Sequence, residues 1–438
     1  MLTIVSRKGV LSLNKSLFER GSVNNIRIHV LPTKRFKTFA ISVYAGIPLQ
    51  EETVATTGLI PFVLRRGTVS YPETTKFREQ LEQLYGAGFG FDIYKRGDYQ
   101  IVQLRMDTIN DSFVNSEDSL LEQSFSFLGE VLTQPVTENG SFRVSYVAAE
   151  KETVRKKLES IINDKIRYAA ERCLEEMFRN DPYRLHPLGS RAELSSITPE
   201  GLYGAYESWL QEVNLDLYVV GDTSLDEVIR LVEKSFKIER SNEKQYTQTN
   251  ISFETGDVRT VEESLNVNQG KLNLGLRTSI TYGSDEYASA LVYNGILGSY
   301  PHSKLFINVR EKESLAYYAS SRYDGHKGMA TIQSGIEIAN YEKALEIIKN
   351  QLEAMRQGEI SDLELSQTKA MIRNHVVEMQ DSAFEMIAYD FNRVISGKER
   401  TAEELLEQVD QITSKEVTDA AQTFHLNTVY FLKGEKGE

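Results

Sequence analysis

The side chains of this 438-residue chain that most readily bind a metal or act as nucleophiles are six histidines and one cysteine. They are His29, His186, His302, His326, His375, His425 and Cys173. A zinc hydrolase needs clustered ligands, as in the helical spacings H-x-x-E-H or H-E-x-x-H. No two of the histidines lie within helical reach of each other, and the cysteine lies in no activating motif. We therefore expect no local zinc motif, and we interpret Cys173 as a small residue buried in a helix.

A second group of candidates lies between Gly298 and Tyr317, where the sequence reads GSYPHSKLFINVREKESLAY. Arg310 could give charge-assisted hydrogen bonds to a peptide carbonyl oxygen, and Tyr317 could aim one O–H donor at the same substrate. From the residues alone a second interpretation is open. In it, Arg310 pairs with Glu311 or Glu313 and Tyr317 packs in a sheet.

Residues 58–68 read GLIPFVLRRGT. This segment resembles the part of the pitrilysin/insulinase (M16) metallopeptidases that carries the inverted zinc motif H-x-x-E-H. In that family the two histidines hold zinc and the glutamate is the general base. Pro61 stands at the first histidine, Leu64 at the glutamate and Arg65 at the second histidine. Proline and leucine offer no lone pair to zinc, and a permanently charged guanidinium repels it.

The third zinc ligand of the family is a glutamate that follows a preserved acid by seven residues. Here the corresponding stretch, 150–157, reads EKETVRKK. Glu150 matches the preserved acid and Lys157 stands at the ligand position, where it brings positive charge to a cation site. The resemblance thus implies no complete catalytic set and no metal in this chain. Taken alone, Glu150 could also belong to a solvated helix face.

Residues 305–317 match the family signature L-F-x-x-V-R-E-K-x-x-L-A-Y almost throughout. In the family, the arginine and the tyrosine of this signature face the catalytic chamber, hydrogen-bond the substrate backbone and steady the developing oxyanion. The resemblance therefore implies that Arg310 and Tyr317 bind substrate.

An internal repeat indicates how the chain positions these residues. Residues 197–221 combine a helix that starts at ITPE with a strand that ends at a glycine, and residues 412–434 repeat the pattern from ITSK. In both copies a threonine precedes proline or serine at the helix start, which is typical of an N-cap. The chain therefore contains two similar halves.

Apolar periodicity predicts the remaining elements. We expect strands at 26–31, 38–43, 88–94, 99–106, 271–277, 316–323 and 329–338, and helices at 75–85, 141–178, 303–313 and 341–356. Interleaved helices and hairpins predict an α+β fold. The polar run from Glu239 to Asn250 reads as linker, so we expect domains at 1–238 and 263–438 joined by a linker at 239–262.

The resemblance covers nearly the whole chain and implies two homologous domains of mostly antiparallel sheet with helices packed on one face. In that family, two such chains close like a clamshell around a chamber. This chain resembles the zinc-less member of a bacterial pair. A zinc-containing M16 subunit would supply the metal and the base, and a peptide or unfolded polypeptide would add as a strand to a sheet edge. The alternatives are a non-catalytic structural subunit and a homodimeric peptide-binding protein.

Composition restricts the remaining classes. The net charge is −13, and this diffuse acidic balance argues against nucleic acid as the main partner. No run of about 18 apolar residues exists, so we expect no membrane span. The first residues lack the apolar region of a signal peptide, and a single cysteine fits a reducing compartment. We therefore expect a cytoplasmic location.

Overall fold

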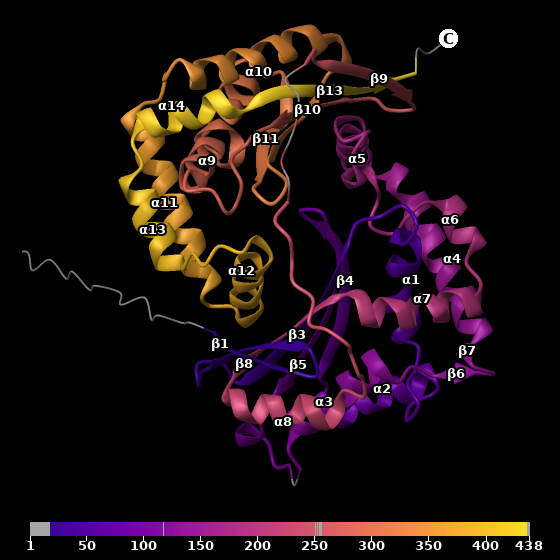
Figure 1. Cartoon of the computed structure of the whole chain (residues 1–438). Helices are drawn as coiled ribbons and strands as arrows, with labels where there is room; N and C mark the ends of the chain where they lie inside the picture. Colours follow the sequence, from indigo (N-terminus) through magenta and orange to yellow (C-terminus); the bar gives the residue numbers. More distant parts are fainter. Residues whose placement is uncertain (1–17, 117, 250, 252, 254–255, 436–438) are drawn as a thin grey trace, which may run out of the picture.

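The computed structural model describes residues 18–435 apart from 117, 250, 252 and 254–255. Each half of the chain builds one sheet (Figure 1). The first sheet has the order β1-β2-β8-β3-β5-β4 and contains β1 (Glu19–Val23), β2 (Ile26–Pro32), β3 (Thr38–Pro48), β4 (Gly88–Arg96), β5 (Tyr99–Ile109) and β8 (Asn214–Gly221). The second has the order β11-β12-β10-β13-β9 and contains β9 (Arg259–Leu265), β10 (Gly270–Arg277), β11 (Ala316–Asp324), β12 (Met329–Ile336) and β13 (His425–Gly434).

The helices of the first half are α1 (Val54–Leu64), α2 (Thr74–Gln83), η1 (Asp111–Phe113), α3 (Leu120–Thr133), α4 (Val144–Ser160), η2 (Ile161–Asn163), α5 (Lys165–Met177), η3 (Pro182–Arg184), α6 (Arg191–Ser196), α7 (Pro199–Glu212) and α8 (Leu225–Ser235). A short hairpin pairs β6 (Thr137–Glu138) with β7 (Ser141–Phe142). The helices of the second half are α9 (Tyr287–Asn294), η4 (Gly295–Ser299), η5 (Phe306–Lys312), η6 (Ile338–Asn340), α10 (Tyr341–Arg356), α11 (Asp362–Met379), α12 (Ala383–Ser396), α13 (Ala402–Gln411) and α14 (Ser414–Thr423). None of these helices has both the length and the apolar content needed to cross a bilayer.

The two sheets share one topology. From the free edge, β4-β5-β3-β8-β2 corresponds to β11-β12-β10-β13-β9. The pairs β2–β8 and β9–β13 are parallel, and every other neighbouring pair in both sheets is antiparallel. Mixed sheets with helices confirm the α+β prediction. The two helices of the repeat, α7 and α14, begin at the predicted N-caps. Thr198 Oγ1 accepts from the Gly201 N–H at 3.0 Å, and Thr413 Oγ1 accepts from the Glu416 N–H at 3.4 Å.

Side-chain alternation divides each sheet into two apolar faces. In β3, Ile41 and Val43 point into the core beneath α1, α3, α7 and α8, whereas Ala40 and Tyr44 point to the opposite face. In the second sheet, the residues of β10 that face α9, α10 and α14 form an equivalent core around Leu274. Each half therefore covers one face of its sheet with its own helices, as expected.

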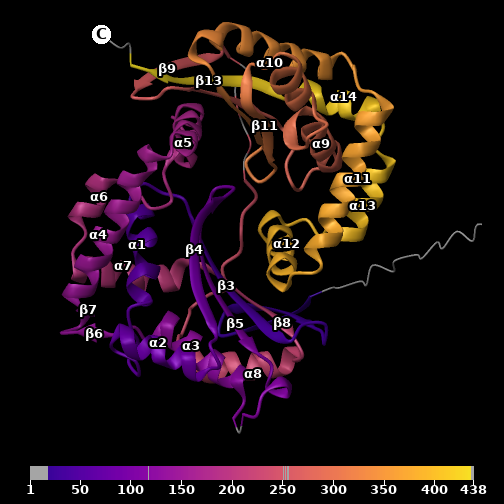
Figure 2. The same cartoon turned by 180° about the vertical axis from the view of Figure 1, so that it is seen from behind.

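A helix from the other half covers the remaining face of each sheet. Helix α12 packs on β3 and β8, and the rings of Tyr44 and Phe391 stack with their centroids 3.8 Å apart. Helix α5 packs on β10 and β13, where Cys173 is buried against Tyr430 and Leu432. Both views show α5 beside the second sheet and α12 above the first (Figures 1 and 2). The halves are thus joined by a reciprocal exchange of helices.

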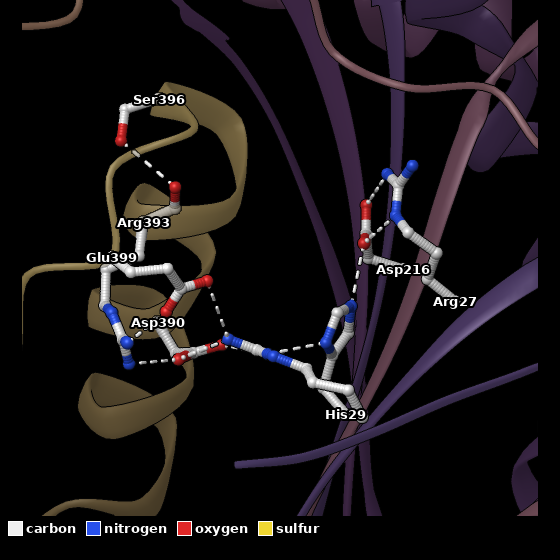
Figure 3. A network of polar contacts seen from close by, with 8 residues as sticks. Arg27, His29, Asp216, Asp390, Arg393, Ser396 and Glu399 are labelled. Atoms are coloured by element: carbon white, nitrogen blue, oxygen red, sulfur yellow. Dashed lines mark hydrogen bonds and ion pairs between the residues drawn. The ribbon is translucent and has the colours of Figure 1, made fainter. Parts of the chain in front are cut away.

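A polar network beneath α12 adds to this junction (Figure 3). Arg20 forms a fork with Asp390 at 2.5 and 3.0 Å and also donates to His29 Nδ1 at 2.6 Å. Because a guanidinium only donates, His29 carries its proton on Nε2 and donates it to Asp216 at 2.8 Å. Burial would raise the pKa of Asp216, but hydrogen bonds from Arg27 and His29 outweigh burial and lower this pKa to about 2. His29 is thus a buried member of this network.

Some predicted boundaries differ from the structure. The helix expected over 141–178 is wrong, because α4 ends at Ser160 and α5 begins at Lys165. Asp164 caps α5 by accepting from the N–H groups of Ile166 and Arg167 at 3.2 and 3.1 Å. An aspartate before a helix favours a helix start, and the prediction of one continuous helix did not use this signal. The helix expected over 341–356 is confirmed by α10. Strand β9 begins inside the range 239–262 expected to be linker, and it pairs with β13.

Candidate functional site

Helix α1 carries the segment that resembles the zinc motif, and it lies in the core of the first half. All its residues except Thr56 are buried, so it is apolar all round, as a core helix is. A Cβ at Gly58 would lie 2.8 Å from the Pro187 carbonyl oxygen. Glycine here lets α1 approach the segment that follows η3. The retained frame therefore serves packing, and Pro61 and Leu64 are part of that packed helix.

A buried ion pair occupies the end of α1. The Glu150 side chain on α4 is fully buried, and its Oε1 accepts from Arg66 Nε at 2.5 Å. Arg65 Nη2 reaches Glu150 Oε2 at 3.4 Å, and the Arg65 guanidinium lies 5.4 Å from the ring centroids of both Phe62 and Phe91. A buried carboxylate requires compensating charge. Two guanidinium groups supply that charge here, so Glu150 is not a solvated helix-face residue.

Arg65 and Lys157 both line a cavity of about 380 Å³ beside the edge strand β4. Its walls come from α1, α4, α5, β4 and residues 186–188. Lys157 Nζ lies 6.0 Å from the Phe62 ring centroid. The structure thus brings Arg65 and Lys157, two of the residues at the predicted ligand positions, to one cavity, which we call the β4 cavity.

The donor set of the β4 cavity does not fit zinc. Pro61 and Leu64 have no side-chain lone pair, and Arg65 and Lys157 present cationic groups. The one imidazole, that of His186, accepts the Leu188 N–H on Nδ1 at 3.1 Å. Burial lowers the pKa of His186 to about 4. Within the ranges that the structure describes, no three histidine, cysteine, aspartate or glutamate side chains gather as a metal site would require.

The second candidate pair lies in the other half. The helix expected over 303–313 is mostly the π-helix η5, whose wider turns leave no mark in residue type. Arg310 lies on η5, exposed, with its guanidinium 4.5 Å from the Phe306 ring centroid. Ser314, with a φ of 52°, then turns the chain into β11. Tyr317, the second residue of that edge strand, is 62% exposed.

The alternative pairing of Arg310 is not observed. Glu313 pairs with Lys343 at 2.7 Å, and the Arg310 guanidinium has no hydrogen bond or ion pair with any residue in the described ranges. The Tyr317 hydroxyl likewise has no protein partner there. Both donors therefore face solvent beside a free sheet edge.

The edge strands β4 and β11 border a second cavity, of about 540 Å³, between the halves. Arg167 of α5 lines both this cavity and the β4 cavity. Lys95 of β4 lines this cavity, lies 4.1 Å from the Tyr183 ring centroid and has its pKa lowered by burial to about 8.

The sequence does not predict which residues line this second cavity. Nothing in the local sequence indicates that α5 packs on the sheet of the other half. The role of Arg66 as the main partner of Glu150 was also not predicted. Two consecutive arginines directly after an apolar helix are the signal that could have pointed to a buried acid.

Comparisons with known proteins identify the family to which the chain is similar. The family described as the peptidase M16 inactive domain matches residues 196–372. The chain is 38% identical over 409 residues to the Bacillus subtilis (strain 168) protein named probable inactive metalloprotease YmfF, covering 93% of this chain and 96% of that protein.

Two solved structures extend the likeness to the fold. A conserved protein from Enterococcus faecalis V583 has a TM-score of 0.89 and 32% identity, covering 97% of this chain and 100% of its own. The peptidase M16 inactive domain from Pseudomonas fluorescens has a TM-score of 0.78 at 16% identity, covering 96% and 99%. With its zinc positions replaced and this likeness along almost all of its length, the chain belongs to the M16 peptidase family as an inactive, peptidase-like member.

Proposed function

We propose that this chain binds an extended peptide and pairs with a zinc-bearing M16 subunit, which supplies the metal and the general base for peptide cleavage. One observation carries the proposal. The zinc positions of the first half hold Pro61, Leu64, Arg65 and Lys157, whereas Arg310 and Tyr317 in the second half remain exposed beside a free sheet edge. A protein kept only as a scaffold has no need of two such exposed donors.

The edge strands explain how a peptide would be held. Within the described part of the chain, β11 pairs only with β12, so one row of its backbone N–H and C=O groups is open to a further strand. Main-chain hydrogen bonds then give affinity with little demand on sequence. Arg310 and Tyr317 stand where η5 turns into this edge, and they can donate to a peptide carbonyl whose oxygen gains negative charge during cleavage.

The buried Cys173 is compatible with a reducing compartment, and burial raises the pKa of its thiol to about 12. We therefore place the pair in the cytoplasm. Cell fractionation with an antibody to the chain tests this placement.

The central test mixes the purified chain with a zinc-bearing M16 protein encoded beside it and measures cleavage of an unstructured peptide. We expect cleavage only in the mixture and loss of it with Arg310→Ala. Lys312→Ala is the matched control, because Lys312 is exposed on the same π-helix. Sedimentation of each mixture shows whether assembly persists. If the pair assembles and the Arg310 variant cleaves at the wild-type rate, the chain is a structural subunit instead.

A further inference from the structure

The geometry of the first half points to a ligand for the β4 cavity. We propose that this cavity binds a carboxylate of an extended peptide, either the C-terminal carboxylate or an aspartate or glutamate side chain. This inference rests on the proposed function, because it names the chemistry of the peptide that the subunit recognises.

The cavity adjoins β4, one of the two edge strands of the first sheet. Among the described strands β4 pairs only with β5, and its residues from Phe89 to Ile93 form one wall of the cavity. A peptide laid along β4 would gain main-chain hydrogen bonds, and its alternate side chains would point to the same side of the strand. The volume of about 380 Å³ accommodates one or two such side chains or a chain end.

The cations of the cavity are only partly neutralised. The buried Glu150 takes its short hydrogen bond from Arg66, so Arg65 contributes only the longer contacts of 3.4 and 3.5 Å. The Lys157 ammonium group has no hydrogen bond or ion pair with any residue in the described ranges. This leaves two side chains with donors available to a ligand.

The remaining charged groups do not cancel this charge. Arg167 Nε donates to Glu171 at 2.7 Å, and the one acid of the lining, Asp92, pairs with Arg105 at 2.6 Å. His186 is neutral near pH 7, because burial lowers its pKa to about 4. The cavity therefore carries positive charge in a chain whose net charge is −13.

A carboxylate suits this arrangement for two physical reasons. The planar fork of Arg65 matches the two oxygens of a carboxylate, and Lys157 adds a point charge. The rings of Phe62 and Phe91 lie 5.4 Å from the Arg65 guanidinium, while the Arg65 side chain stays 42% exposed and Lys157 is exposed, so both cations can be reached by an incoming anion. The adjacent sheet edge favours a peptide over a free inorganic anion, because only a peptide can use the backbone groups of β4.

Fluorescence anisotropy with the full-length chain tests the proposal. The probes are one N-terminally labelled extended peptide with a free C-terminus, the same peptide amidated, and the amidated peptide with one asparagine changed to aspartate. We expect at least about tenfold tighter binding for one of the two acids than for the neutral amide, since one charge-assisted hydrogen bond contributes that much. The tighter of the two identifies the source of the carboxylate.

Two variants make the test specific. Lys157→Gln should remove most of the preference for the acid, because it removes a positive charge whose ammonium group makes no hydrogen bond or ion pair among the described residues and lies only near the Phe62 ring. Lys156→Gln is the control, because Lys156 lies one residue away and pairs with Glu152 instead. Raising the salt from about 50 mM to about 500 mM should also reduce the preference.

The outcomes separate this inference from the proposed function. If all peptides bind equally and Arg310→Ala still abolishes cleavage by the mixed pair, the carboxylate inference fails and the proposed function stands. If no peptide binds and Arg310→Ala leaves cleavage unchanged, both fail. If inorganic phosphate displaces the acidic peptide at a similar concentration, the cavity is a general anion site and the peptide claim is overturned.

Discussion

The edge strands β4 and β11 occupy the same place in their sheets but present different chemistry. Counted from the first residue of each strand, Tyr317 corresponds to Phe89, and the residue seven positions earlier is Arg310 in one half and Glu82 in the other. The second half thus offers two hydrogen-bond donors where the first offers a ring and an acid. One topology therefore positions two exposed hydrogen-bond donors in one half and a cationic cavity in the other.

A second contrast concerns the faces that the exchanged helices cover. Asp216 of β8 pairs in register with Tyr44 of β3 on the face under α12, where it is fully buried and held by Arg27 and His29. On the corresponding face of the second sheet, under α5, the hydroxyl of Tyr430 donates to Glu263, whose side chain is 27% exposed. The first half therefore holds its carboxylate in the interior, whereas the second holds it nearer the surface.

The largest effect should come from removing Arg310, the arginine that distinguishes the edge of the second half from that of the first. Arg310→Ala should lower the cleavage rate of the mixed pair by about 100- to 1000-fold, the usual cost of removing an oxyanion donor. Glu82→Ala, at the corresponding place in the first half, should leave the rate within about twofold. Steady-state peptide cleavage measures both. Equal losses for the two variants would mean that the halves do not differ in this role.

The buried ion pair of the first half should be the next most sensitive. Arg66→Ala removes the short partner of a fully buried carboxylate and should cost about 2 kcal/mol of unfolding free energy, below the usual range for buried pairs because Arg66 is 27% exposed and Arg65 remains. Urea unfolding followed by circular dichroism gives the value. An unchanged midpoint in the variant would show that Arg65 alone neutralises Glu150.

The full burial of Asp216 predicts an acid-sensitive interior in the first half. The folded pKa of Asp216, about 2, lies below its unfolded value. Its contribution is therefore fully present above about pH 4 and is lost as the pH falls through about 2, a change of about 2 kcal/mol. Urea unfolding across this range should show the slope, and Asp216→Asn should flatten it. A slope identical in the variant would assign the acid sensitivity to other carboxyl groups.

The smallest effect should come from Tyr317→Phe. This change removes one exposed O–H donor and keeps the ring, so cleavage by the mixed pair should fall by about three- to tenfold. Tyr85→Phe, another exposed tyrosine, is the control and should have no effect on the rate. A loss as large as that of Arg310→Ala would mean that the hydroxyl has a larger part in stabilising the oxyanion.

Local signals predicted much of this structure. The alternation of apolar and polar residues predicted the strands, and Thr198 and Thr413 predicted two helix starts. Both signals could be used because caps and periodicity act between near neighbours in sequence. The lost zinc chemistry was also predictable, since it depends on residue type at Pro61, Leu64 and Arg65. What could not be predicted depends on distant contacts or on finer geometry. The exchange of α5 and α12, the cavity beside β4 and the π-turns around Arg310 are of this kind.

The exchanged helices determine what would follow if the backbone were cut between α8 and β9. Each fragment would keep its own sheet, but the helix that shields one side of that sheet would belong to the other fragment. Neither fragment could bury residues such as Tyr44 or Tyr430 by itself. Refolding should then succeed only when both fragments are mixed, as in complementation of a split protein, and its rate should depend on the concentration of each.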